Sequence, residues 1–302
     1  MENNYVSFNP KDLPIPRVHQ LLLGAVGPRP IAFASTIDAK GIPNLAPFSF
    51  FNVFSANPPI LIFSPANSGR TGEPKDTYLN VKEHAEVVIN IVDYNMVEQM
   101  SLASSPYGKD TDEFVKAGFT KVASDIVKPF RVKESPAQFE CKVIEVKELG
   151  TGGGAGNLII CEVVKMHFNP EILTAEGQVD QLKIDLISRM GGNWYCRSNE
   201  QSMFEITKPI PTKGVGFDQI PADILESTIL SANDLGKLGG IEELPNETDV
   251  NEYKLIELSD LFVSLEGNAE ELEKQLHLKA KEHLAKNELN EAWMTLLAFN
   301  NG

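Results

Sequence analysis

The sequence predicts a mostly β protein, an antiparallel barrel with short helices, followed by an acidic helical segment. Apolar and β-branched runs recur through the first 200 residues and are bounded by proline, glycine and aspartate. The connections between these runs leave room for short helices and few βαβ units, which favours an antiparallel barrel. After about Pro209, helical spacing replaces the β-type runs. We therefore expect one domain over residues 1–208 and a helical extension over residues 209–302.

The first strands are predicted by apolar runs on both sides of a turn. Residues 30–37 and 43–55 are rich in Ile, Phe and Val and enclose Asp38-Ala39-Lys40-Gly41. Aspartate and glycine supply turn conformations, so the pair predicts a β-hairpin. The short apolar run Ile60–Ser64 predicts a buried strand, and the β-branched run Glu86–Val92 predicts a fourth.

Short helices are expected between the strands, because apolar residues there alternate with polar neighbours and capping residues precede them. They are Asp76–His84, a helix capped by Asp93 or Asn95 that runs to about Ala103, and Thr111–Ala117, which Gly118 ends.

Two long β-type runs, Ala137–Leu149 and Asn157–Phe168, are joined by the glycine-rich string Gly150–Gly156. The string fits a G-x-G-x-x-A spacing. A dinucleotide fingerprint requires a helix after the glycines, and here a strand follows. The string is therefore interpreted as the flexible loop of a hairpin.

The region after Pro209 has helical signals but no catalytic constellation. Pro221–Leu230 predicts a helix that begins with proline, and Ser231 predicts the cap of a further short helix that stops at Gly239-Gly240. From Asn268, apolar residues recur at helical spacing as far as Leu296. We expect one long amphipathic helix, with its apolar stripe on the barrel or on a partner subunit.

The charge of the chain is uneven. Residues 201–302 hold 19 acidic and 8 basic side chains, which accounts for −11 of the net charge of −15. Nucleic acid is excluded as a partner, because phosphate binding needs clustered Lys and Arg. The acidic half is interpreted as a solvated face, with a docking surface for a basic partner as the alternative.

Targeting, cysteine and metal signals are weak. No apolar stretch reaches the ~20 residues of a membrane-spanning helix, and no secretory signal begins the chain, so we expect no membrane association and a cytoplasmic protein. The three cysteines, Cys141, Cys161 and Cys196, are widely spaced and predict buried apolar positions rather than disulfides. The five histidines lack metal-ligand spacing, so no metal site is predicted.

The segment Gly27–Thr77 carries the chemistry. Its apolar runs end in small hydroxyl residues, prolines, one arginine and one lysine, which suits a flat apolar ring with a phosphate tail, such as flavin mononucleotide (FMN). Its motifs are Pro28-Arg29-Pro30-Ile31-Ala32, Ser35-Thr36, Gly41, Asn44-Leu45-Ala46-Pro47-Phe48-Ser49, Pro58-Pro59 and Lys75-Asp76-Thr77, with a weaker one at Arg189–Tyr195.

On these motifs, the chain between about Val18 and Arg197 resembles the flavin-reductase-like proteins with an FMN-binding split β-barrel, the group that includes flavoredoxins. The resemblance implies a homodimer with FMN at its interface. It also implies a reductase in which NAD(P)H donates a hydride to FMN and electrons pass onward. The alternatives are a flavoredoxin-like electron carrier that a protein partner reduces, and a non-catalytic flavin-binding module.

The predicted phosphate site lies after the third early strand. The strongest candidates are Ser64, Arg70, Lys75 and Thr77, because a guanidinium fork, an ammonium and hydroxyls all bind phosphate oxygens. The helix start at Asp76–Thr77 would add its dipole. The alternative is that Arg70 and Lys75 are ordinary solvated loop charges.

The flavin ring is expected along Ala46-Pro47-Phe48-Ser49, with Thr36 and Asn52 reaching it from adjacent strands. Core packing is the alternative for the phenylalanines, because it is the commoner fate of aromatic side chains. For Asn44 two interpretations remain: it is a residue of the site, or it is a turn residue.

Four further residues are expected to close the site. By resemblance, Tyr107, Arg189, Gly191 and Tyr195 reach the flavin from the second chain of a dimer. Arg29, between two prolines, either approaches a nicotinamide phosphate or pins the barrel mouth.

Overall fold

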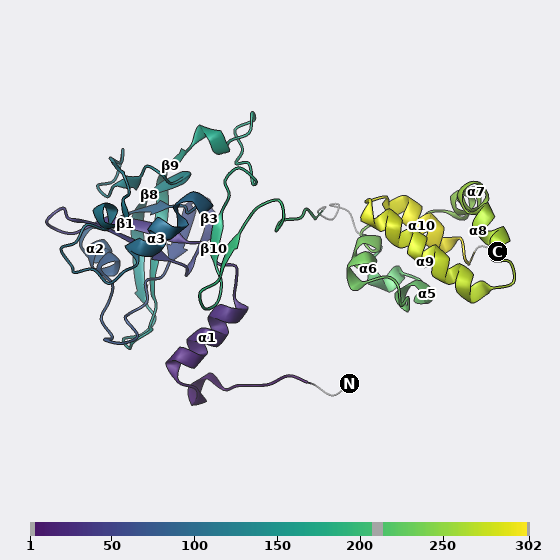
Figure 1. The fold of residues 1–302 in the computed structure, drawn as a ribbon, viewed down its shortest axis with the longest axis horizontal. Helices are drawn as coiled ribbons and strands as arrows, with labels where there is room; N and C mark the ends of the chain where they lie inside the picture. Colours follow the sequence, from purple (N-terminus) through teal and green to yellow (C-terminus); the bar gives the residue numbers. More distant parts are fainter. Residues whose placement is uncertain (1–3, 207–213, 301–302) are drawn as a thin grey trace. The chain divides into compact units, whose positions relative to one another are not determined.

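The computed structural model describes residues 4–206 and 214–300. The chain divides into two compact units, Met1–Phe204 and Glu205–Gly302 (Figure 1). The predicted domain boundary, between residues 208 and 209, lies outside the described residues. Each unit is described by itself.

The first unit is built on an antiparallel sheet, as the sequence predicts, and this sheet has seven strands. Its strand order is β2-β1-β5-β8-β9-β4-β3. The strands are β1 (Ala32–Ile37), β2 (Pro43–Phe48), β3 (Phe51–Ala56), β4 (Pro59–Phe63), β5 (Glu86–Asn90), β8 (Ala137–Glu148) and β9 (Asn157–Phe168).

One predicted strand is in fact two. The run 43–55 breaks at Ser49 and Phe50 into β2 and β3, which occupy opposite edges of the sheet. A two-residue connection can join opposite edges only if the sheet curls until those edges meet. The break is therefore where the barrel closes, and no turn residue marks it in the sequence.

The alternation of β1 side chains separates two cores. Phe33 packs with Met100 and Phe114 in a cluster beneath the helices α3 (Val97–Ala103) and α4 (Glu113–Ala117). Ala34 packs with Phe63 and other strand residues in the second cluster. β1 thus has one apolar face inside the barrel and one under the helical cover.

The short helices between the strands are confirmed. The Asp93 carboxylate accepts the Met96 amide at 3.1 Å and so starts the second of them, while Gly118 ends the third in the left-handed conformation. The elements are α2 (Asp76–His84), a 3-10 turn η2 (Tyr94–Met96) continued by α3 (Val97–Ala103), and α4 (Glu113–Ala117).

Several shorter elements complete the first unit. They are the 3-10 turns η1 (Pro10–Asp12) and η3 (Pro170–Ile172), the helix α1 (Ile15–Ala25), the pair β6 (Lys121–Val122) and β7 (Arg131–Val132), and the hairpin β10 (Ile187–Arg189) and β11 (Tyr195–Arg197).

The second unit is helical, as predicted, but the helices differ in length from those expected. The expected helix 221–230 forms only four residues. The next helix is confirmed, with a capping box between Ser231 and Asp234. The elements are η4 (Phe217–Gln219), α5 (Ala222–Leu225), α6 (Ala232–Leu238), α7 (Glu247–Glu257), α8 (Ser259–Ser264), α9 (Ala269–Ala285) and α10 (Leu289–Leu297).

The single long C-terminal helix of the sequence prediction is wrong. The chain leaves the helical path after α9 and passes through Asn287, whose φ is +60°, before α10 begins. α9 and α10 pack on each other, so the apolar stripe is buried within the unit itself. Leu284, Trp293 and Leu296 belong to this core.

A search for membrane-spanning segments among the described residues finds no helix of sufficient length and apolarity.

Candidate functional site

The loop between β4 and α2, residues 64–75, packs against the turn between β8 and β9, residues 150–156. Ser64 is 7% exposed, and its hydroxyl has no hydrogen-bond partner among the described residues. A Cβ atom on Gly156 would lie 2.8 Å from the Ser64 Oγ, so a larger residue at this position would force the Ser64 hydroxyl to move. The glycine turn therefore forms one wall beside Ser64.

Hydrogen bonds join the glycine turn, which the sequence analysis interprets as a flexible hairpin loop, to the 64–75 loop. The Asn67 amide donates to the Ala155 carbonyl at 2.9 Å, and the Gly154 amide donates to the Asn67 carbonyl at 3.0 Å. The Asn157 side chain also donates to the Asn67 Oδ1 at 2.9 Å. These hydrogen bonds thus fix the glycine turn against the 64–75 loop.

Two cations lie on this loop without a protein partner. Arg70 and Lys75 are exposed, and neither forms a hydrogen bond or an ion pair within residues 4–206 and 214–300. Lys75 directly precedes α2, which begins at Asp76. The first amides of a helix lack intrahelical acceptors, so the same end of the loop offers backbone donors as well.

A buried polar cluster ties α2 to the first two strands. The Asn44 side-chain amide donates to the hydroxyls of Thr36 and Thr77 at 3.2 and 2.9 Å. The Asn80 side chain donates to the same Thr36 oxygen at 3.0 Å. Thr36 has no exposed surface, so it acts on the site through Asn44, which lies in β2 and not in a turn.

The predicted ring-binding segment divides between the two faces of β2. Phe48 packs on the barrel core, and Ala46 lies on the same face because side chains alternate along a strand. Pro47 and Ser49 face the other way and line a cavity of about 420 Å³.

This cavity, the β2–α3 cavity, joins residues far apart in the sequence. It brings the predicted Pro47 and Ser49 together with the predicted Arg189 and Tyr195 of the same chain. Their predicted contribution across a dimer interface stays a prediction. The remaining lining residues, which the sequence analysis missed, are Ile31, Met100, Ser101, Ser104 and Asn193.

The hairpin β10–β11 is held at the cavity by Arg29 and Gly191. The buried Arg29 guanidinium donates to the carbonyls of Leu23 and Met190, both at 2.9 Å, and to that of Val26. A Cβ atom on Gly191 would lie 3.0 Å from the α1 backbone, so α1 and the hairpin tip are in close contact (Figure 1). Of the two roles expected for Arg29, the geometry favours pinning the barrel mouth.

Of the predicted site residues, Pro47, Ser49, Arg189 and Tyr195 line the cavity and the others do not. Asn52 and Tyr107 are two that lie elsewhere. Asn52 is exposed on the edge strand β3, and its side-chain oxygen accepts the Val53 amide at 2.8 Å. The Tyr107 ring lies under the Lys116 ammonium, 5.8 Å from the ring centroid.

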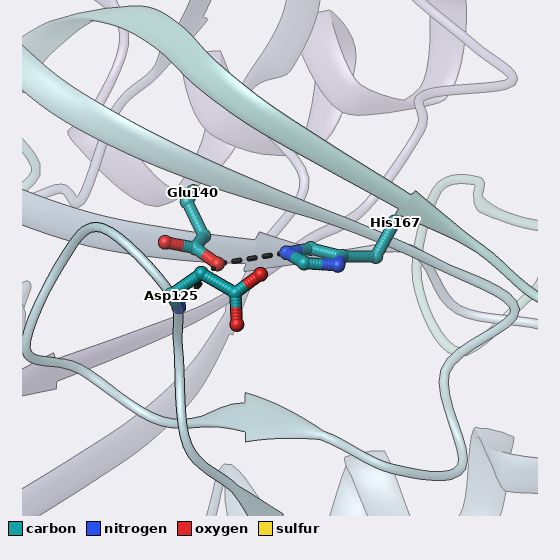
Figure 2. Close-up of side chains that lie close together, drawn as sticks. All are labelled: Asp125, Glu140 and His167. Atoms are coloured by element: carbon teal, nitrogen blue, oxygen red, sulfur yellow. Dashed lines mark hydrogen bonds and ion pairs between the residues drawn. The ribbon is translucent and has the colours of Figure 1, made fainter.

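Asp125, Glu140 and His167 form the one metal-like cluster found among the described residues (Figure 2). The chain spacing of the histidines gave no sign of it. Both Glu140 oxygens are already occupied: they accept the amides of residues 125, 126 and 127 at 2.6–3.1 Å and the His167 Nε2 at 2.7 Å. Asp125 in turn pairs with Lys165. The arrangement is a hydrogen-bonded anchor for the 125–127 turn.

The same bonds set the charge of Glu140. Burial would raise the pKa of this carboxyl, but the amide donors and His167 lower it to about 2. Glu140 is therefore a carboxylate at neutral pH.

Comparison with known proteins agrees with the fold and the motifs. The family described as "Flavin reductase like domain" matches residues 25–183, more than half of the chain. The chain therefore belongs to this flavin-binding family. The match ends before the second unit begins.

Three solved structures each cover about two thirds of the chain. Nitrilotriacetate monooxygenase component B from Bacillus cereus is 30% identical, with a TM-score of 0.63 over 68% of this chain and 100% of its own. The 2-nitrobenzoate 2-nitroreductase NbaA from Pseudomonas fluorescens is 27% identical, with a TM-score of 0.60 over 69% and 100%. A split-barrel protein from Shewanella frigidimarina, assigned as a flavin reductase, is 22% identical, with a TM-score of 0.56 over 67% and 100%. The last similarity shows the fold alone, and it confirms the predicted split barrel.

Proposed function

We propose that this protein is an FMN-dependent oxidoreductase in which NAD(P)H donates a hydride to FMN and electrons pass on to an acceptor. One observation carries the proposal: within the matched residues 25–183, two cations without a protein partner lie on a loop that ends at a helix N-terminus. Such a loop is a ready site for a phosphate group.

Each residue of the loop contributes a different group to the FMN phosphate. Arg70 offers a planar fork and Lys75 a compact charge. The free Ser64 hydroxyl donates from the side of the glycine turn. Asp76 and Thr77 bring the first turn of α2, and the bond from Asn44 fixes the Thr77 hydroxyl.

The residues after Asn44 orient the ring. Ala46-Pro47-Phe48-Ser49 present backbone groups and one hydroxyl to the ring edge, with Thr36 behind them and Asn52 on the neighbouring edge strand. Tyr107, Arg189, Gly191 and Tyr195 close the site. When bound, FMN supplies the hydride-accepting N5 atom and the redox chemistry, while the protein positions it and excludes water.

We also propose a homodimer that completes this site. On the edge strand β3, Val53 is 65% and Phe54 is 63% exposed, and Trp194 at the hairpin tip is 78% exposed. Exposed apolar side chains of this size mark an interaction surface, and a second copy of the chain would cover them. Light scattering should give twice the chain mass, and Phe54→Lys should shift it toward one chain. A monomeric wild type would refute the dimer.

FMN retention tests the phosphate site directly. Purified protein should show the flavin band near ~450 nm, a property of this cofactor class. Arg70→Ala and Lys75→Ala should each weaken FMN binding by about 1.5–3 kcal/mol, the range for hydrogen bonds to charged groups. Lys142→Ala, at an exposed lysine of β8 that has no ion pair among the described residues, is the matched control. Unchanged affinity in both loop variants would show that the phosphate lies elsewhere.

Stopped-flow mixing with NADH or NADPH tests the reaction. Loss of flavin absorbance with either donor supports the reductase. The alternative is an electron carrier that a protein partner reduces. The lack of a nicotinamide-binding fingerprint in the sequence favours this alternative. Failure of both nucleotides to bleach the flavin, with reduction by a partner protein, would favour the carrier.

A further inference from the structure

The second unit carries a groove between α7 and α10, which we name the α7–α10 groove. Its volume is about 520 Å³. Within the described residues no lysine or arginine lines it, and His283 of α9 is its one basic side chain. Its carboxylates come from α7 and from the beginning of α10, and they are Asp249, Glu252, Glu257, Glu288 and Glu291. Negative charge therefore lies on both sides of the groove.

The unit itself does not neutralise this charge. Among residues 4–206 and 214–300, neither Glu252 nor Glu291 forms an ion pair. The nearby Lys279 ammonium donates to the Glu257 backbone carbonyl at 3.2 Å and not to a carboxylate. Carboxylates that face one another without a cation repel each other, and a basic ligand would relieve that repulsion.

The floor of the groove is fixed by hydrogen bonds. His283 is bonded at both ring nitrogens, to the Glu288 Oε2 at 2.7 Å and to the Tyr253 hydroxyl at 3.3 Å. Burial raises the pKa of Tyr253, a hydrogen bond with Thr295 lowers it, and three carboxylates of the groove raise it again. A ligand would therefore meet a negative surface that is already ordered, which lowers the entropic cost of binding.

Apolar side chains accompany the carboxylates. Ile256 and Met294 line the groove, and Ile256 is 67% exposed. Leu255, its neighbour on α7, is 74% exposed, so apolar surface continues along the helix beyond the groove. Exposed apolar surface rimmed by charged residues is typical of a protein interaction site. The combination suits a ligand that is both basic and apolar.

The charge selects among the possible occupants. Nucleic acid and anionic membranes are negative and would be repelled. A second copy of this chain has a net charge of −15, so contact between two such grooves is opposed as well. A protein segment with basic residues on one face and apolar residues on the other matches both features of the groove. An amphipathic helix laid into a groove is a recurring form of such recognition.

We propose that the α7–α10 groove is a docking site for a basic amphipathic helix of a partner protein. Lysines or arginines of that helix pair with Glu252 and Glu291, and its apolar side chains cover Ile256. The family match ends at residue 183, so docking is a function added to the flavin-binding unit. The contact involves no flavin and is therefore independent of the proposed function.

Fluorescence anisotropy of the full chain with a labelled synthetic peptide tests the proposal. The probe is a helical peptide with leucines on one face and lysines on the other. Its control keeps the lysines and replaces each leucine by alanine, which preserves the helix but reduces the apolar face. The leucine peptide should bind at least about tenfold more tightly, because its apolar face covers Ile256. Equal affinities of the two peptides would overturn the proposal.

Variants of the chain locate the binding. Glu252→Gln combined with Glu291→Gln removes two charges from the groove and should weaken binding of the leucine peptide at least about fivefold. Ile256→Asn should weaken it to a similar extent, and its largely exposed position keeps the unit folded. The charge-matched control is Glu226→Gln combined with Glu266→Gln, at exposed glutamates outside the groove, and it should behave as the wild type. Equal weakening by the two glutamate pairs would show that net charge alone attracts the peptide and would overturn the site.

Salt and a competitor test the class of occupant. The affinity for the leucine peptide should fall as the salt concentration rises, since salt screens exposed charges. An affinity that does not change with salt would refute the charge complementarity. Spermidine is a small polycation without an apolar face and should displace the peptide only at much higher concentration. Displacement by spermidine and by unlabelled peptide at equal concentrations would assign the groove to small polycations and overturn the docking site.

Discussion

Replacement of Glu140 by glutamine should destabilise the first unit strongly at neutral pH. Glu140 is fully buried and accepts four hydrogen bonds, three from the amides of residues 125–127 and one from His167. In Glu140→Gln, the side-chain NH2 group is a donor, and it would lie against backbone amides that are donors as well. The loop at 125–127 would then lose at least one of its bonds.

The pKa of Glu140 sets the size of the effect. It falls from the ordinary value of 4.5 to about 2, because the donors outweigh burial. Each pKa unit corresponds to about 1.4 kcal/mol, so the carboxylate contributes about 3 kcal/mol. Removal of one partner from a buried charged network typically costs 3–5 kcal/mol, which agrees.

The sign of the pH dependence follows from the same shift. A carboxyl group with a lowered pKa in the folded state stabilises fully above its unfolded value, near 4.5. The contribution falls as acid is added, and it is lost near pH 2. The difference between wild type and Glu140→Gln should therefore be constant from neutral pH to about 4.5 and shrink below it.

Hydrogen exchange is the suitable assay, because it reports opening of the first unit separately from the second. In Glu140→Gln, the amides of Asp125, Ile126 and Val127 should lose protection first. The protected amides of β8 should show the global loss of about 3 kcal/mol. Glu145→Gln, at an exposed glutamate of the same strand, is the control. Equal exchange in the two variants, within about 0.5 kcal/mol, would refute the role given to Glu140.

Two other predictions test the glycine turn and the second unit. Gly156→Ala places a Cβ 2.8 Å from the Ser64 oxygen and should weaken FMN retention at least about fivefold, whereas Gly152→Ala meets no atom within 4 Å and should leave retention unchanged in equilibrium dialysis. Trp293→Ala removes a fully buried indole and its hydrogen bond to the Leu238 carbonyl at 3.0 Å; it should cost the second unit about 3–5 kcal/mol in urea unfolding, with FMN retention unaffected.

Local patterns predicted the elements that local interactions determine. The helix Asp76–His84 was predicted with both its ends. Its polar–apolar alternation and the β-type run that follows it are both local patterns of the sequence. The break at Ser49 and Phe50 was missed, since it arises from closure of the sheet, a long-range event. The turn at Asn287 was missed because asparagine in the left-handed conformation replaces the expected glycine.

The candidate site shows the same division. Arg70 and Lys75 were predicted as phosphate ligands from one contiguous segment, and they lie on one loop. Ser101 and Asn193 were not found, because packing of α3 and the β10–β11 hairpin alone brings them together. Glu140 and His167 are 27 residues apart, and only the register of β8 with β9, in which Glu140 faces Lys165, makes them diagonal neighbours.

The glycine turn illustrates why a motif must be judged with its structural partner. Its spacing imitates a dinucleotide loop, and the strand that follows correctly excludes that function. Glycines at 153 and 156 nevertheless allow a close approach: a Cβ at Gly153 would lie 3.0 Å from the Ser68 carbonyl, and one at Gly156 would lie 2.8 Å from the Ser64 Oγ. They let the turn approach the loop that carries Ser64, Arg70 and Lys75. If that loop binds the FMN phosphate, the glycines serve the phosphate indirectly, by fixing the backbone that holds its ligands.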